Sequence, residues 1–561
     1  MKFWKRVTAA VTAGLLCIGI APVVQTAQPE MEITANAEID DGLKYGVTFS
    51  GNISITQCIT SATEVEIPAE IDGIAVTIIW NCAFEYCSNL TSIIIPDSIT
   101  TIERNAFKNT PLLNNQTGIK YADTWVIDCD TDVTTAEFKA GTKGIADEAF
   151  QDCTNLTSVV IPDGVTSIGE SAFAGCENLV SVTIPDSVTS IGKNAFSGTP
   201  LLNEQTGIKY ADTWVIGCDA DVTTAECKDG TKGVAGNAFY NCTNLTSAVI
   251  PDSMVGISSG AFRGCDNLKA VYITDLAAWC RMNIGSYDSN PLYYAQKLYL
   301  NDVLVTELTI PDSVTSIEKS TFSKCRSLTT VTIPDSVTSI GNFAFISCSN
   351  LANISMPNNL KSIGRSTFNG CYRLTGVEIP DSVTNIGDTA FVNNISLTTI
   401  TIPDGVTSLK EHLFLGCTKL TSVTIPKSVT SVEECAFYDC NALADIYYGS
   451  TQDAWNTIVF STGNDALTSA TIHFADGTVQ EGYLPGDVDS STAVDPDDAY
   501  LCLLAYAKQS VGSDSGLTVA QMKAADVDGD GSITANDAYY ILLYYAKQSV
   551  GQDVTWEELL G

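Results

Sequence analysis

The chain has 561 residues, with 29 basic and 65 acidic side chains and a formal net charge of −36. Such an acidic chain repels nucleic acid and anionic lipid, so we expect no nucleic-acid partner. Its length exceeds that of one ordinary core and predicts either several domains or a repeat array.

The N-terminal segment has the layout of a secretory signal peptide. Three basic residues precede the apolar run Val7–Val24, and Ala35-Asn36-Ala37 offers a cleavage site of small residues. Two glycines and a proline interrupt the run, which disfavours a membrane anchor. We therefore expect residues 1–37 to be a signal peptide and the mature protein to be secreted, with no membrane span.

An apolar pattern repeats through residues 38–478. The segment VTIPDSVTSIG at Val182–Gly192 recurs letter for letter at Val331–Gly341, and the Phe of the unit mostly recurs every 23 residues. The full unit reads A-F-x-x-C-x-x-L-x-x-V-x-I-P-D-S-V-T-S-I-G-x-x. A period in the twenties is typical of a solenoid, and L-x-x-V-x-I matches the strand of a leucine-rich repeat. One unit buries about six apolar side chains, which does not offset roughly 23 kcal/mol of backbone ordering, so coils must stack.

The A-F-x-x-C-x-x-L and I-P-x-x-V-x-x-I elements of this array resemble those of the BspA-type leucine-rich repeat family of bacterial surface proteins. The resemblance covers roughly residues 60 to 475. It implies an α/β-type repeat solenoid with a parallel β-sheet, and a role in adhesion to host or matrix proteins. The family has no shared catalytic residues, so none is transferred, and the protein or surface ligand of the array stays unknown.

Insertions interrupt the array, and cysteines mark its coils. Segments 109–135 and 198–224 are near-identical, which indicates duplication of a block of coils. A longer insertion contains Trp279, Tyr287, Tyr293 and Tyr294. The aromatic insertions are better candidates for a partner site than the Thr- and Ser-rich strand face, which we interpret as a solvated sheet surface. Ten cysteines lie three residues after a Phe anchor, namely Cys87, Cys153, Cys176, Cys242, Cys265, Cys325, Cys348, Cys371, Cys417 and Cys440. Because Asn394, Thr110 and Thr199 replace this cysteine in three coils, we favour buried, unpaired thiols over disulfides.

The repeat pattern ends before a predicted linker at residues 479–485, and a different sequence follows. Two acidic loops lie 39 residues apart, and each is followed by a helical segment, predicted at 499–510 and 538–549, that ends in A-K-Q-S-V-G. Both loops have the EF-hand spacing, which places oxygen ligands at positions 1, 3, 5, 7, 9 and 12 around a hard cation. In the second loop these positions hold Asp526, Asp528, Asp530, Ser532, Thr534 and Asp537.

Paired loop–helix units at the end of a secreted chain resemble a type I dockerin, here over residues 486–561. The resemblance implies a small α-helical module that binds two Ca²⁺ ions in EF-hand-like loops and attaches to the cohesin module of a cellulosome scaffoldin. It assigns ligand roles to the six second-loop residues and to Asp487, Asp489, Ser491, Ala493 through its carbonyl, Asp495 and Asp498. It also assigns cohesin contacts to Pro496, Asp497, Ala535 and Asn536.

No catalytic residue is predicted. The chain has two histidines, in separate regions, and its turn aspartates recur at one place in each coil, so neither forms a catalytic arrangement. The sequence predicts a secreted, non-catalytic adhesion or protein-interaction solenoid that is attached to a scaffoldin and is cellulosome-associated. One alternative is a cellulosomal enzyme or accessory protein in plant polysaccharide degradation, such as a glycoside hydrolase. The other alternative is an inert spacer.

Overall fold

The computed structural model describes residues 36–38, 42–48, 52–58, 61–71, 73–480, 483–489, 491, 493–517, 519–552 and 554–560. The predicted signal peptide lies outside this part of the chain, except for its last two residues. The chain forms two compact units. Unit 1 comprises the residues up to Val305 together with Ile317–Ser327, and unit 2 comprises Thr306–Ser316 together with the residues from Leu328 onward. Within the described residues, no helix has the length and apolar character that a bilayer crossing requires.

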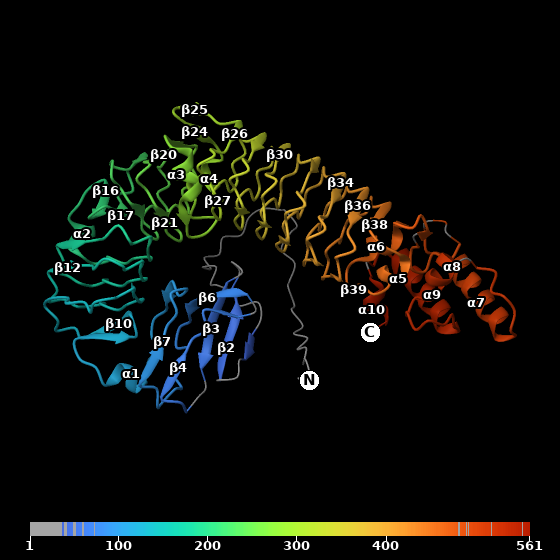
Figure 1. The fold of residues 1–561 in the computed structure, drawn as a ribbon, viewed down its shortest axis with the longest axis horizontal. Coiled ribbons are helices and arrows are strands. Elements are labelled where there is room, and N and C mark those ends of the chain that lie inside the picture. Colours follow the sequence, from blue (N-terminus) through green and yellow to red (C-terminus); the bar gives the residue numbers. More distant parts are fainter. Residues whose placement is uncertain are drawn as a thin grey trace. The chain divides into compact units, whose positions relative to one another are not determined.

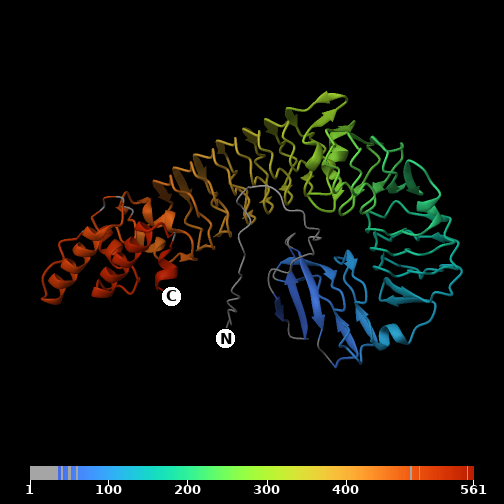
Figure 2. The ribbon, with the colours of Figure 1, turned by 180° about the vertical axis from the view of Figure 1, so that it is seen from behind.

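Unit 1 opens with antiparallel strands that lead into parallel ones. Strands β1, β2 and β3 pair antiparallel, β3 then pairs parallel with β6, and the blue hairpin strands lie side by side in both views (Figures 1 and 2). The strands of this first part are β1 (Asn36–Glu38), β2 (Leu43–Val47), β3 (Ile53–Cys58), β4 (Glu64–Glu66), β5 (Glu70–Ile71), β6 (Ile74–Ile79), β7 (Ser92–Ile94) and β8 (Thr101–Ile102).

The rest of unit 1 consists of coils with two short strands each, interrupted by the insertions. Each insertion adds short helices, which are α1 (Pro111–Asn114), α2 (Pro200–Asn203), α3 (Leu276–Arg281) and α4 (Pro291–Ala295). One set of sheets is parallel except for the antiparallel pairs β9–β10 and β16–β17. It contains β9 (Ile119–Ala122), β10 (Trp125–Cys129), β11 (Gly144–Ile145), β13 (Ser167–Ile168) and β15 (Ser190–Ile191), then β16 (Ile208–Ala211), β17 (Trp214–Cys218), β19 (Gly233–Val234), β21 (Gly256–Ile257) and β23 (Asn283–Ile284). The other set is parallel except for the antiparallel pair β24–β25. It contains β12 (Ser158–Val160) and β14 (Ser181–Thr183), then β18 (Thr224–Glu226), β20 (Ser247–Ile250), β22 (Ala270–Ile273), β24 (Leu298–Leu300) and β25 (Val303–Leu304).

Unit 2 continues the coils and ends in a helical module. One series of its strands is β26 (Glu307–Thr309), β28 (Thr330–Thr332), β30 (Asn353–Ser355), β32 (Gly376–Val377), β34 (Thr399–Thr401), β36 (Ser422–Ile425), β38 (Asp445–Tyr448), β40 (Thr471–Phe474) and β41 (Val479–Gln480). The other series is β29 (Ser339–Ile340), β31 (Ser362–Ile363), β33 (Asn385–Ile386), β35 (Ser408–Leu409), β37 (Ser431–Val432) and β39 (Val459–Phe460). Strand β27 (Ser316–Ile317) has one residue in each unit. Helices α5 (Gln452–Trp455) and α6 (Asp465–Ser469) lie at the end of the array. Val479 and Gln480, which the sequence analysis placed in the linker, pair with β40 as β41.

Each coil follows from the repeated sequence. In β14, Val182 is 6% exposed whereas Ser181 and Thr183 face solvent, so the strand buries one side chain and presents two. Pro185 then ends pairing, and its carbonyl accepts a 3.1 Å hydrogen bond from the Val188 N–H to close the turn. Equivalent residues of successive coils pair in parallel, as Val159 does with Val182, so the predicted parallel β-solenoid is confirmed.

The core contains a file of stacked phenylalanine rings. The rings of Phe150 and Phe173 lie 5.0 Å apart at 11°, and in unit 2 Phe368 stacks on Phe391 at 5.5 Å. Because each coil supplies one ring, no coil can bury its own Phe completely, and the stack is the smallest stable unit. The buried residues of the repeat therefore serve mainly to pack each coil against the neighbouring coils.

The predicted file of buried cysteines is present, with one exception. The thiol of Cys176 donates to the carbonyl of Phe150 in the preceding coil at 3.1 Å, and Cys417 and Cys440 donate to the Phe anchors 26 residues before them at 3.2 Å. The exception is Cys242, which forms a disulfide with Cys218 and so contradicts the prediction for that coil. Sequence reasoning missed this bond because Cys218 lies in an insertion, outside the repeated unit.

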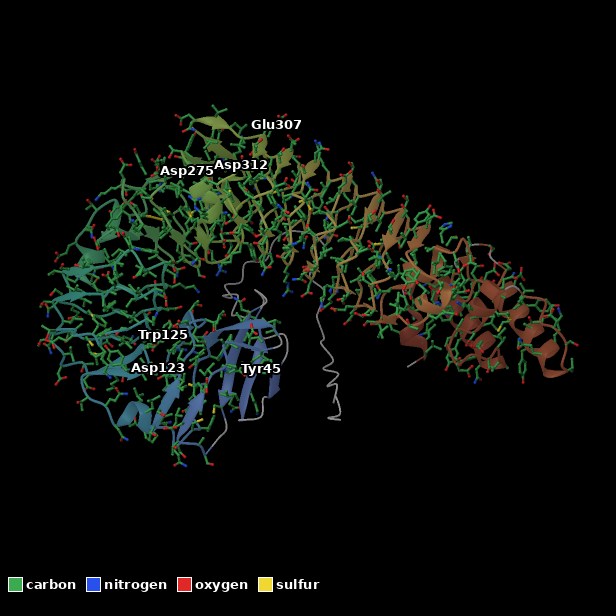
Figure 3. The ribbon with its side chains drawn as sticks, viewed as in Figure 1. Tyr45, Asp123, Trp125, Asp275, Glu307 and Asp312 are labelled. Carbon is green, nitrogen blue, oxygen red and sulfur yellow. A yellow bond between two sulfur atoms is a disulfide. The ribbon has the colours of Figure 1, made fainter. Side chains whose placement is uncertain are left out.

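The two near-identical insertions form β-hairpins. Strands β9 and β10 pair antiparallel around Asp123, whose φ of 50° makes the tight turn. The Asp123 carboxylate accepts the Ile95 N–H at 2.9 Å and fastens the hairpin tip to a neighbouring coil, and Asp123 and Trp125 lie together at this tip in Figure 3. The Trp125 ring lies where a Cβ on Gly144 would be, so only glycine fits at residue 144.

The module after residue 483 is helical. It contains α7 (Pro496–Ser510), α8 (Val519–Ala525), α9 (Ala535–Ser549) and α10 (Trp556–Leu560), around a small core that includes Ala499, Cys502, Ala525, Ala538 and Ile541. Helices α7 and α9 each begin three residues earlier than predicted, because Asp495 and Thr534 act as N-caps and Asp498 and Asp537 complete capping boxes.

Candidate functional site

The first acidic loop, residues 487–498, is organised around Asp498. One oxygen of this carboxylate accepts the N–H groups of Val488 at 2.7 Å and Asp489 at 3.0 Å, and the other accepts the Asp495 N–H at 2.8 Å. This arrangement brings carboxylate oxygens of Asp487, Asp489 and Asp498 within 4.8 Å of one another. Three of the six ligands predicted for this loop therefore form a cluster.

The other predicted ligands of the first loop shape its backbone. The Ser491 N–H donates to carboxylate oxygens of both Asp487 and Asp489 at 2.9 Å, and the Ser491 hydroxyl donates to the Ala493 carbonyl at 3.2 Å. Asp495 caps α7 by accepting the Asp497 N–H at 2.8 Å and does not join the cluster. Thr492, at position 6, lies outside the described residues.

The second acidic loop, residues 526–537, has a different cluster. Carboxylate oxygens of Asp526, Asp528 and Asp530 lie within 4.8 Å of one another, and Asp526 also accepts the Gly531 N–H at 2.9 Å. The other carboxylate oxygen of Asp526 is buried and has no hydrogen-bond partner among the described residues. Such an orphaned buried oxygen is costly unless a donor or a cation satisfies it.

Position 12 of the second loop serves the helix. The Asp537 carboxylate accepts the N–H groups of Val527 and Thr534 and the Thr534 hydroxyl at 2.8–3.0 Å, so it does not join the second cluster. The Ser532 N–H donates to Asp530 at 2.8 Å, and the Thr534 hydroxyl accepts the Asn536 N–H at 3.1 Å. Both clusters consist of hard oxygen atoms on a tight loop, and this donor chemistry fits Ca²⁺.

Electrostatics in both loops favours a cation. Burial raises the pKa of Asp498 above its ordinary value, and burial together with the charges of Asp537, Asp530 and Asp528 raises the pKa of Asp526. Among the described residues, no Lys or Arg forms an ion pair with either loop. Neighbouring carboxylates are both negatively charged and repel each other, and a bound divalent cation reduces that repulsion.

The helical module presents exposed apolar side chains. The four predicted contact residues, Pro496, Asp497, Ala535 and Asn536, are all exposed in the first turns of α7 and α9. Larger side chains lie further along both helices at matching places, namely Tyr500, Leu503 and Tyr506 on α7 and Tyr539, Leu542 and Tyr545 on α9, with exposed fractions of 37–64%. Sequence reasoning did not single out these six residues, although their shared 39-residue offset was a usable signal.

The tryptophans of the insertions, together with Tyr121 and Tyr210, are buried and do not form the predicted partner site. Trp125, Trp214 and Trp279 are at most 2% exposed, and the Trp279 indole N–H donates to the Thr321 carbonyl at 3.0 Å. The hydroxyls of Tyr121 and Tyr210 accept backbone N–H groups of Lys139 and Lys228 at 2.9 and 3.0 Å. These side chains pack the insertions onto the coils instead of meeting a ligand.

The threonines at the strand edge bond within the array. The hydroxyls of Thr329, Thr398 and Thr421 donate to carbonyls of the preceding coils at 2.9–3.2 Å. At the end of the array an aromatic pair replaces this pattern: Tyr447 stacks on His473 at 4.8 Å, and His473 Nε2 lies 2.7 Å from the Asp445 carboxylate. This pair lies on the otherwise Thr- and Ser-rich face, in register with Thr424.

A cavity of about 250 Å³ lies in unit 2, lined by Trp455, Phe460, Tyr483 and Lys523 among others. Asp465 is the one carboxylic acid in its lining. Hydrolysis of a glycosidic bond ordinarily requires two carboxyl groups that face each other, and this cavity does not supply them.

Comparison with known proteins identifies the array. Residues 56–126, 143–212, 216–281, 295–417 and 384–476 match the family described as BspA type Leucine rich repeat region, in six copies. No curated protein matches the chain. Solved structures similar to it include a leucine rich cell surface protein from Faecalibacterium prausnitzii, with 24% identity over 78% of this chain and 99% of that chain and a TM-score of 0.27. The pneumococcal vaccine antigen PcpA shares 20% identity over 77% of this chain and 98% of its own, with a TM-score of 0.31, and a leucine-rich repeat protein from Bacteroides ovatus shares 23% over 70% and 94%, with a TM-score of 0.24.

Proposed function

Because the chain belongs to the BspA-type leucine-rich repeat family, we propose that it is a secreted, non-catalytic protein-interaction protein. Its array binds a protein or surface ligand, and its C-terminal module, a type I dockerin, attaches it to the cohesin module of a cellulosome scaffoldin in the presence of Ca²⁺. The observation that carries the attachment is the presence of a carboxylate cluster in each loop of a duplicated loop–helix unit.

Calcium supports this role by completing a small module. Its core is built largely from small side chains such as Ala499, Ala525 and Ala538, and a domain of this size depends on bound ions or covalent links for stability. Ca²⁺ would draw Asp526, Asp528 and Asp530 together in the second loop and Asp487, Asp489 and Asp498 in the first. At a hundred times its dissociation constant, each ion adds about 2.7 kcal/mol to the stability of the module.

The exposed tyrosines and leucines of α7 and α9 support a protein partner for the module. Aromatic side chains are enriched at the centres of protein interfaces, and here both helices expose them at matching positions. At the start of the two helices, Asp497 and Asn536 add polar side chains beside Pro496 and Ala535. A surface of this kind suits a cohesin, whose binding would bury the tyrosines.

The chemistry of the array supports binding over catalysis. An acid–base mechanism needs a paired site within a cleft, and the cavity in unit 2 contains Asp465 without a second carboxyl group. A cellulosomal enzyme, which is the first alternative, would need a catalytic module in addition to the segments described above. An inert spacer, the second alternative, differs from the proposal only in having no ligand.

The proposal is tested with the full chain from residue 38 onward and a panel of immobilised cohesin modules. We expect binding in Ca²⁺, loss of binding in a chelator, and recovery when Ca²⁺ but not Mg²⁺ is restored. The double variant Asp487→Ala/Asp526→Ala should not bind, whereas the control Asp335→Ala, an exposed turn residue of the array, should bind normally. If no cohesin binds and calorimetry detects no Ca²⁺ uptake, the dockerin assignment is wrong. A pull-down from the native secretome with the double variant then tests the array alone, and failure to enrich any protein favours the spacer.

A further inference from the structure

Three cysteines occupy one structural position at the places where hairpins lead into coils. Cys58 ends β3, Cys129 ends β10 and Cys218 ends β17, and each of these strands is the second strand of an antiparallel hairpin. These cysteines lie outside the repeated unit, so the repeat pattern does not account for them. In each case the next coil supplies a file cysteine, namely Cys87, Cys153 or Cys242.

One of the three pairs is already joined, since Cys218 forms a disulfide with Cys242. Cys129 and Cys153 precede these two residues by 89 positions each, which is the length of the duplicated block. The surroundings are duplicated as well. The carboxylates of Asp130 and Asp219 accept the N–H groups of equivalent glycines at 2.7 and 2.8 Å and contact equivalent lysines at 2.8 and 2.9 Å.

The thiols of Cys129 and Cys153 share one hydrogen-bond acceptor. Both thiols donate to the carbonyl oxygen of Asp130, at 3.4 and 3.8 Å, and both side chains are buried, with exposed fractions of 6% and 0%. The two thiols also contact each other, which lowers the pKa of Cys153 and raises that of Cys129. This pair therefore has the partners, the backbone frame and the proximity of the pair that is joined.

Cys58 and Cys87 repeat the arrangement at the start of the array. The Cys87 thiol donates to the Cys58 carbonyl at 3.4 Å, and both side chains are fully buried. Contact with Cys87 and burial raise the pKa of the Cys58 thiol. By contrast, Cys176 and Cys265, the next members of the file, donate to the carbonyls of Phe150 and Phe239 and have no hairpin cysteine at the equivalent place.

We propose that Cys129–Cys153 and Cys58–Cys87 form disulfides equivalent to Cys218–Cys242, so that each of the three hairpins is covalently joined to the coil that follows it. This inference goes beyond the proposed function and is independent of calcium and cohesin.

The bonds form by thiol–disulfide exchange with a protein disulfide donor outside the cytosol. One cysteine thiolate attacks the donor disulfide and releases a donor thiolate, and the second cysteine thiolate then displaces the other donor sulfur. Each new S–S bond removes two electrons and two protons from the pair, and the donor disulfide becomes a dithiol. Because the sulfur atoms are buried in the folded coil, the exchange takes place before the coil closes on its hairpin.

Thiol counting on the chain from residue 38 onward, exported into an oxidising compartment, tests the inference. Eighteen of the nineteen cysteines follow residue 37, so three disulfides leave twelve reactive thiols after denaturation without reductant, whereas the recorded bond alone leaves sixteen. We expect twelve. Sixteen overturns the proposal, and fourteen overturns it for the pair whose linked peptide is missing.

Peptide mapping then assigns the bonds. A protease that cleaves after glutamate separates Cys153 from Cys176, because Glu170 lies between them. We expect linked peptides that join Cys129 to Cys153 and Cys58 to Cys87, and their loss on reduction. The control Cys176→Ser should keep every link and lose one thiol, whereas Cys153→Ser should lose one link and gain one reactive thiol. If Cys153→Ser leaves the thiol count at eleven, Cys129 has another partner and the assignment is wrong.

Discussion

Three residues after each phenylalanine, the coil needs a small side chain that donates a hydrogen bond into the core. Cys417 donates to the Phe391 carbonyl at 3.2 Å, and Asn394 donates through its amide to the Phe368 carbonyl at 3.1 Å. Thr110 and Thr199 donate to Phe107 and Phe196 at 2.6 and 2.7 Å. The side chains of cysteine, asparagine and threonine can all donate a hydrogen bond, which explains why asparagine and threonine can replace cysteine at this position.

Asn394 satisfies this need at a cost, since its Oδ1 atom is buried without a hydrogen-bond partner in the described part of the chain. Leaving such an atom unsatisfied costs about 1–3 kcal/mol. We therefore expect Asn394→Cys to raise the free energy of unfolding by about 1 kcal/mol, measured by denaturant titration in reductant. The reverse change in the neighbouring coil, Cys371→Asn, should lower it by a similar amount. A lower stability for Asn394→Cys would contradict this account.

Asp147 is a titratable residue at the junction of coils. Its carboxylate accepts the Glu170 N–H at 2.7 Å, while burial, followed by the charges of Glu103, Glu170 and Glu148, raises its pKa to about 7. The folded state therefore binds this proton more tightly than the unfolded state does. The contribution to stability is greatest at acidic pH and is lost as the pH rises from about 4 to about 7.

We expect Asp147→Asn to remove this pH dependence, because asparagine keeps the acceptor and carries no charge. At pH 8 the variant should be more stable than the parent by a few kcal/mol, since each pKa unit corresponds to about 1.36 kcal/mol, and at pH 4 the two should be alike. Asp335→Asn is the control, because Asp335 accepts the equivalent bond from Asn358 at an exposed site. Equal stabilisation at both pH values would show that charge is not the cause.

At the scale of elements, the coils were predictable from the sequence, but the contacts between the insertions and the coils were not. Period, strand pattern and turn residues all lie within the repeated unit, so Val182 and Pro185 alone indicate a strand and its end. The Cys218–Cys242 bond depends on how an insertion folds back onto the next coil, and the sequence pattern does not contain that information. The starts of α7 and α9 were misplaced because Asp495 and Thr534 were interpreted as ligands, whereas their side chains cap the helices.

The two acidic loops should differ in calcium affinity. Position 5 is Asp530 in the second loop, where it belongs to the carboxylate cluster, but neutral Ser491 in the first. We expect the first site to be weaker by about tenfold or more, which corresponds to at least 1.4 kcal/mol. Asp526→Ala should therefore abolish cohesin binding, whereas Asp487→Ala should weaken it less.

Calcium titration of both variants by calorimetry, with Asp335→Ala as the control, checks this ranking. Equal loss of binding in the two variants, or a larger loss for Asp487→Ala, would refute it.

At the scale of the whole molecule, the array and the C-terminal module have different expected roles. The array supplies stacked coils, and the last 76 residues supply the predicted attachment. Acidity spread along the chain favours solubility and disfavours polyanionic partners. The expected ligand is therefore a protein or an uncharged or basic surface.

We expect the purified chain to release no reducing sugar from cellulose, xylan or pectin, because no paired carboxyl groups line the cavity in unit 2. Activity above a buffer blank that follows the protein through two chromatography columns would contradict the non-enzyme assignment. Asp465→Asn is the matching variant, since activity that survives this change would not come from the cavity.

The register of the coils has a consequence at the level of the gene. Residues 23 positions apart face each other, as Val331 faces Ile354 and Ile400 faces Val423, so every interface between regular coils is nearly the same. Recombination between near-identical repeats that adds or removes 23 codons leaves each remaining interface intact and changes the reach of the array by about 4.8 Å. Any other number of codons moves Phe out of its file and Cys away from its carbonyl. A population of such genes can therefore vary the length of the array one coil at a time, while the entry hairpin and the two acidic loops are inherited unchanged.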